Sequence, residues 1–117
     1  MTEPHPTPAE LLGERLEQVR AQRDALTAAI DDMRVTRSLT VADDEHDPEG
    51  STVSLDQARD VALLDRAERT LAELVAAQAR LVAGTYGTCE RCGREIPPER
   101  LLARPEARRC VPCAQRT

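Results

Sequence analysis

Four cysteines in two pairs are the residues whose spacing indicates chemistry. Cys89 and Cys92 form one C-x2-C pair, and Cys110 and Cys113 form a second after seventeen intervening residues. This spacing is typical of a four-cysteine zinc site. Each short turn can place two thiolates on one side of a metal, and two such turns complete a tetrahedron. Because four sulfur ligands leave no open position, we expect one structural Zn²⁺ and no catalytic metal.

The residues around the cysteines fit this interpretation. Gly93 follows Cys92, so the turn can take a positive φ and direct backbone N–H groups at sulfur. A zinc ion with four thiolates carries a charge of −2, which four nearby arginines can offset: Arg91, Arg94, Arg108 and Arg109. Disulfides and a redox-active pair are the alternatives. A reducing compartment, expected below, and the absence of a surrounding βαβ pattern disfavour both.

The segment that carries the cysteines has few large apolar side chains, so the metal must supply much of its folding free energy, on the order of 10 kcal/mol. Within it, residues 97–102, which begin with Pro97 and Pro98 and end with Leu101 and Leu102, resemble a short helix opened by proline. The rest of the chain must therefore provide a separate support for this zinc segment.

That support is predicted to be two long helices. From about residue 9, side chains alternate at spacings of four and three over about four heptads, which predicts a coiled-coil seam. This first seam comprises Leu12, Leu16, Val19, Arg23, Leu26, Ile30, Met33 and Arg37. A second seam comprises Leu64, Ala67, Leu71, Leu74, Gln78 and Leu81. Ser54 and Gln57 resemble a capping box at the start of the second helix, and Gly84 follows its end, as a C′ glycine does.

A turn joins the two helices at residues 47–50, where Pro48 and Gly50 favour tight backbone conformations. We therefore predict a mostly α protein, an antiparallel two-helix coiled-coil hairpin with a small C-terminal four-cysteine zinc finger. The expected parts are a disordered lead at 1–8, the hairpin at 9–84 with its tip at about 43–53, and the finger at 85–117. A helical bundle and a parallel dimer of separate helices are the alternatives, and we expect a monomer.

The two predicted parts of the chain, the helices and the finger, also differ in charge. Residues 1–84 hold 17 acids and 9 arginines, whereas residues 85–117 hold 4 acids and 7 arginines. The predicted tip is the most acidic segment, with Asp43, Asp44, Glu45, Asp47 and Glu49. The net charge of −5 disfavours non-specific binding to duplex DNA. The sequence shows no nucleophile–base pair or phosphate-binding glycine loop, so we expect no enzymatic activity.

The amino-acid composition limits the kind of hydrophobic core that the protein can have and indicates where in the cell it is located. The chain has no Phe, no Trp and a single Tyr, Tyr86, so a thick aromatic core is excluded. No apolar run is long enough to span a membrane, and the first ten residues lack the features of a signal peptide. We therefore expect a cytoplasmic protein with no membrane association.

The finger resembles the DksA/TraR zinc-finger family. The resemblance is carried by Gly84-x-Tyr86-Gly87-x-Cys89-x2-Cys92-Gly93-x2-Ile96, then Arg100-Leu101-x-Ala103-x-Pro105, and Cys110-x2-Cys113. The upstream helices with an acidic turn are also similar to that family. The resemblance implies a bacterial regulator that binds RNA polymerase directly and reads no DNA sequence. It implies that the coiled coil enters the polymerase secondary channel and that the acidic tip residues approach the active-site region.

The sequence departs from the family pattern at two places. Asp47 aligns with the first acid of the tip motif Asp-x-x-Asp-x-Ala, but Gly50 and Thr52 replace its second Asp and its Ala. Members that respond to the alarmone ppGpp carry basic residues on the second helix. Arg66 and Arg69 could serve as effector-binding residues, but Glu73 occupies a position where another basic residue is expected, so we expect no ppGpp dependence.

Two other functions remain open from the residues alone. One is a structural or adaptor coiled-coil protein whose partner is not polymerase. The other is a nucleic-acid-binding zinc module that uses the basic C-terminal segment, although seven arginines against four acids and one aromatic residue form only a weak basic patch.

Overall fold

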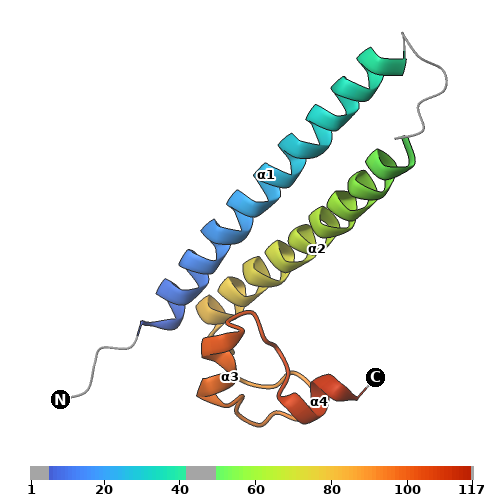
Figure 1. The fold of residues 1–117 in the computed structure, drawn as a ribbon. Coiled ribbons are helices and arrows are strands. Elements are labelled where there is room, and N and C mark those ends of the chain that lie inside the picture. Colours follow the sequence, from blue (N-terminus) through green and yellow to red (C-terminus); the bar gives the residue numbers. More distant parts are fainter. Residues whose placement is uncertain (1–5, 42–49, 117) are drawn as a thin grey trace. The chain divides into compact units, whose positions relative to one another are not determined.

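The computed structural model describes the backbone of residues 6–41 and 50–116, and the side chains of residues 6–36 and 55–116. Its elements are α1 (Pro8–Val41), α2 (Gly50–Ala83), α3 (Pro98–Ala103) and α4 (Val111–Gln115), labelled in Figure 1. Among these residues, the β-type backbone pairing is one isolated antiparallel bridge between Thr88 and Glu95. The mostly helical prediction is confirmed. The expected lead up to residue 5 and the acidic residues 43–49 lie outside the described part.

The chain divides into two compact units. One contains residues up to Gln18 together with Thr70–Thr117, and the other is Val19–Arg69. In each unit a segment of α1 packs against a segment of α2, and the two run in opposite directions (Figure 1). The zinc-finger segment and the helix ends nearest to it therefore belong to the same unit.

The seam prediction is largely confirmed by burial. In the unit that contains the finger, the buried apolar residues of the helices are Leu12, Leu16, Leu71, Leu74 and Ala77. In the other unit they are Val19, Ile30 and Ala67. Ala77 was not part of the predicted seam, although it is fully buried. Arg23, a predicted seam residue, is only partly buried. Its guanidinium pairs with the neighbouring Asp24 at 3.1 Å, and its side chain is 38% exposed.

The start of α1 contains a capping box that the sequence analysis did not identify. The backbone N–H of Glu10 donates to Thr7 Oγ1 at 3.2 Å, and the N–H of Thr7 donates to Glu10 Oε2 at 3.4 Å. Pro8 occupies the first helical position, where its missing N–H costs no hydrogen bond. The pattern Thr-Pro-x-Glu is a start signal that can be read from the sequence.

The predicted start of α2 was wrong. Ser54 lies within a helix that begins at Gly50, so it cannot act as the N-cap, which needs a non-helical backbone. The end of α2 was predicted correctly. Gly84 takes φ +82°, its N–H donates to Leu81 O at 3.3 Å, and the N–H of Thr85 donates to Arg80 O at 2.9 Å. These two bonds form a Schellman motif, which only a residue tolerant of positive φ allows at low cost.

Within the described residues, no helix is both long and apolar enough to cross a lipid bilayer.

Candidate metal centre

The backbone of the finger places the first cysteine pair on a tight turn. Extended backbone at Thr88 and Glu95 brackets this turn, and the Cys89 N–H donates to Arg94 O at 2.8 Å. The Gly93 N–H donates back to Cys89 O at 2.9 Å, and Gly93 takes φ +75°, as the sequence analysis expected. A side chain at this position would force the turn into a strained conformation.

The second cysteine pair is positioned by a short helix. Cys110 is the N-cap of α4, with extended backbone at φ −68° and ψ 165°, and Cys113 lies inside the helix. A backbone bond joins the two halves of the finger, because the Glu90 N–H donates to Arg108 O at 2.9 Å. This bond aligns the chain before the second pair with the turn of the first pair.

The four thiols converge as a tetrahedral metal site requires. The Sγ atoms of Cys89, Cys92, Cys110 and Cys113 all lie within 4.8 Å of one another. Cys92 Sγ and Cys110 Sγ are 3.8 Å apart. A regular tetrahedron with Zn–S bonds of about 2.3 Å has sulfur–sulfur edges of about 3.8 Å. None of the four forms a disulfide. The donor set and its spacing therefore fit one structural Zn²⁺, as predicted.

The thiols differ in their readiness to lose a proton. Backbone N–H donation, foremost from Cys92, lowers the pKa of Cys89 to about 6. The side-chain contact with Cys110, together with burial, raises the pKa of Cys113 to about 12. Because zinc binds thiolates, loading the site releases the protons that these thiols carry.

The apolar core of the finger is small and is built on the ligands themselves. Buried Ile96 packs with Cys89 and Cys113, and Leu101 of α3 and Cys110 contact this cluster. Ile96 is held in place by its N–H, which donates to Gly87 O at 2.7 Å. One isoleucine and one leucine are too little apolar surface for an independent core, so zinc binding is the main source of stability.

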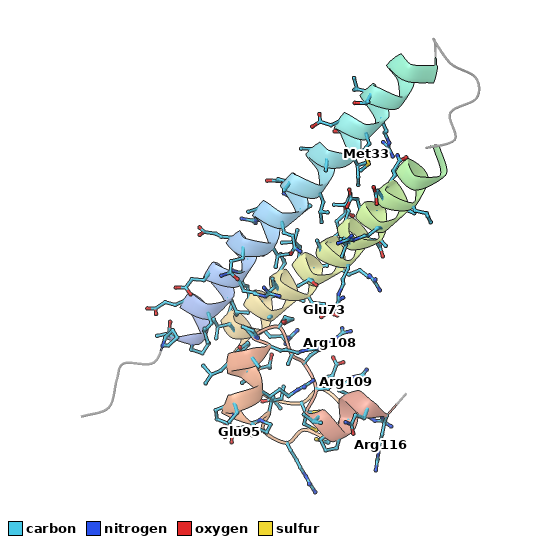
Figure 2. All side chains as sticks on the ribbon, in the orientation of Figure 1. Met33, Glu73, Glu95, Arg108, Arg109 and Arg116 are labelled. Carbon is cyan, nitrogen blue, oxygen red and sulfur yellow. The ribbon has the colours of Figure 1, made fainter. Side chains whose placement is uncertain are left out.

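Side chains connect the finger to the end of α2 within the same unit. Arg80 donates to Glu106 O at 3.4 Å, and Arg108 pairs with Glu73 at 3.9 Å. Figure 2 shows Arg108 and Glu73 next to each other. The Tyr86 hydroxyl, just after α2, donates to Pro105 O at 2.9 Å. Burial raises the pKa of Tyr86, with Arg80 opposing and Glu106 adding to the shift.

The arginines expected to offset the zinc–thiolate charge have different partners. Arg108 and Arg109 both approach Glu90 Oε1, at 3.8 and 2.9 Å. Arg91 donates to Arg116 O at 3.3 Å, near the end of α4. No structural contact was predicted for Glu90 or for Arg100, whose Nε donates to Arg109 O at 2.8 Å. Proximity of charges in the sequence does not reveal which carboxylate two arginines share.

The remaining candidate residues belong to the other compact unit or lie outside the described part. Arg66 and Arg69 lie exposed on α2, and Arg69 pairs with Asp65 at 3.2 Å, one turn earlier. The tip residues Asp43, Asp44, Glu45, Asp47 and Glu49 lie outside the described residues. Their role and that of the two arginines stay predictions.

Comparisons with known proteins agree with this geometry. Residues 84–117 match the family model of the prokaryotic DksA/TraR C4-type zinc finger. A 46-residue segment is 52% identical to an uncharacterized protein of Aquifex aeolicus, and covers 39% of this chain and 32% of that protein. A 68-residue segment is 38% identical to general stress protein 16O of Bacillus subtilis, and covers 58% of this chain and 42% of that protein. The matches thus span less than half the length of either curated relative.

The fold also matches a solved structure. Transcription factor DksA2 from Pseudomonas aeruginosa superposes with a TM-score of 0.56 and 24% sequence identity, over 96% of this chain and 89% of that one. This match shows likeness of fold, and the finger match adds the four-cysteine motif. Residues 84–117 thus form a DksA/TraR-type C4 zinc finger, and the chain that carries it has a DksA-like fold.

Proposed function

We propose that this protein is a bacterial transcription regulator that binds RNA polymerase directly. The observation that carries the proposal is the joining of a DksA/TraR-type zinc finger to two long packed helices in one chain. The likeness of fold to a protein described as a transcription factor supports it. The finger has no open metal position and the proposal includes no catalytic step.

The proposed mode of action is insertion of the helical hairpin into the polymerase secondary channel. Five acids between residues 43 and 49, with no base among them, would bring concentrated negative charge to the entering end. Such charge is suited to approach a bound Mg²⁺ or basic residues in a deep channel. The protein would act as a cytoplasmic monomer, without recognising a DNA sequence and without ppGpp.

Binding to polymerase core enzyme tests the proposal. The zinc-loaded chain should co-purify with the core enzyme, and the Asp47→Ala/Glu49→Ala variant should bind equally well but change the lifetime of promoter complexes. Asp31→Ala/Asp32→Ala removes the same charge from exposed positions of α1 and should change neither property. Repeating the lifetime measurement with ppGpp should give the same values.

Absence of binding at micromolar concentrations would overturn the proposal. The family-type finger would then serve only as a fold and a zinc site, and the adaptor function would be the better explanation. Equal effects of the tip pair and the α1 pair would show that bulk charge, and not the tip, produces the change in promoter complexes.

A further inference from the structure

A shallow, open cavity on the finger, beside the cysteine cluster, is lined by three arginines and one glutamate. Glu90, Arg91, Arg109 and Arg116 line this cavity, whose volume is about 440 Å³. Arg109 and Arg116 are labelled in Figure 2, near α4. All four residues belong to one compact unit of the chain, so the cavity lies within that unit.

Among the residues that the structure describes, the hydrogen bonds of these arginines leave most of their N–H donors unused. Arg109 gives its Nε to Glu90 Oε1 at 2.9 Å, and Arg91 gives one terminal nitrogen to Arg116 O at 3.3 Å. The guanidinium of Arg116 has no partner among the described residues. A guanidinium has five N–H donors in a fork that matches the two oxygens of a carboxylate. The cavity is therefore lined by donors that an external oxyanion can accept from.

Charge around the cavity is unbalanced. Three guanidinium groups face a single carboxylate, and Arg108 also uses that carboxylate, at 3.8 Å. The zinc–thiolate group of the finger offsets part of this positive charge. Binding of an anion should therefore be weak and sensitive to salt, because the arginines are exposed.

From this cavity we propose a docking site for an acidic segment of a partner protein, with side-chain carboxylates received by Arg91, Arg109 and Arg116. The Arg109–Glu90 pair already shows a carboxylate held in this position. A nucleic acid fits less well, because no aromatic side chain lines the cavity for base stacking. This inference does not depend on polymerase being the partner.

Titration of the zinc-loaded full chain with a short oligoglutamate peptide, followed by NMR, tests the proposal. We expect shifts at Arg91, Arg109 and Arg116, loss of binding as salt is raised, and no binding of an oligoglutamine peptide of equal length. Arg116→Gln should weaken binding several-fold, and Arg91→Gln/Arg116→Gln by about tenfold. Arg116→Gln is the safer variant, because its guanidinium supports no other described residue.

Arg94→Gln is the matched control, since Arg94 is an exposed finger arginine outside the cavity. It should leave oligoglutamate affinity within about twofold. Zinc content must be the same in all variants. The proposal is wrong if the peptide binds no better than oligoglutamine, or if Arg94→Gln weakens binding as much as Arg116→Gln. Tighter binding of a single-stranded oligonucleotide, lost in the same variants, would also overturn it and assign the cavity to nucleic acid.

Discussion

Ile96 allows a quantitative test of how packing and metal binding share the stability of the finger. Its side chain is 1% exposed and lies against two of the four ligands, Cys89 and Cys113. Ile96→Ala removes most of the only large side chain fully buried in this core. Such truncations cost about 2–5 kcal/mol when the cavity does not collapse. The backbone bond from residue 96 to Gly87 is kept, so the change isolates the side chain.

The cost should appear as weaker zinc binding. Because the finger folds when it binds zinc, free energy lost from the folded finger is lost from apparent zinc affinity. At about 1.4 kcal/mol per factor of ten, affinity should fall by roughly 30-fold to a few thousand-fold. Competition against a chromophoric zinc chelator measures this directly. All four ligands are unchanged in the variant, so a loss of affinity cannot come from the coordination sphere.

Leu102→Ala is the matched control on the neighbouring helix α3. It removes as many carbon atoms, but Leu102 is half exposed. Its expected cost of about 1 kcal/mol corresponds to roughly a fivefold loss of zinc affinity. Ile96→Ala with zinc affinity within threefold of the unaltered protein would refute the reasoning, because it would mean that the ligand turns are formed without this core.

Three further predictions concern the helices and Tyr86. Leu74→Ala should lower the free energy of unfolding by about 2–5 kcal/mol and Tm by roughly 10 °C or more. Val82 is 91% exposed on the same helix, so Val82→Ala should leave Tm within a few degrees. Circular dichroism melting measures both variants. Thr7→Ala should destabilise α1 by about 0.5–2 kcal/mol and speed amide exchange in its first turn, and unchanged exchange would contradict the capping box. The phenol of Tyr86, the single aromatic residue, should ionise at higher pH in the folded than in the unfolded protein, because burial raises its pKa. The neutral phenol contributes to stability below the unfolded pKa of about 10, and this contribution is lost as pH rises through the higher folded pKa. An absorbance titration with identical midpoints in the folded and unfolded states would exclude this burial effect.

Much of the fold could be predicted because it rests on local patterns. Heptad spacing identifies Leu12, Leu16, Leu71 and Leu74 as buried, since a fixed rise and twist per residue determine which side chains share a helix face. Gly84 marks the end of α2 because positive φ is inexpensive only for glycine. The zinc site could be predicted because its chemistry fixes both ligand type and spacing.

The errors arose where two signals competed or where contacts were distant in sequence. Ser54 precedes an apolar residue, as a cap does, yet the helix extends back to Gly50. The same signal at Thr7 stands among three prolines, which by themselves indicate an irregular segment. The partners of Glu73, Glu90 and Arg100 depend on how the finger folds onto itself and onto α2, which no local pattern encodes.

The contacts between the finger and α2 also bear on how this finger could be transferred to another protein. The family match begins at residue 84, directly at the end of α2. Yet Arg80 reaches Glu106, and Glu73 reaches Arg108, from positions before that boundary. The Schellman bond from Thr85 to Arg80 also crosses it. A graft cut at residue 84 would keep every zinc ligand but lose the side chains that orient the finger. The smallest self-sufficient module for a chimera therefore begins at about residue 73, with about three turns of its own helix.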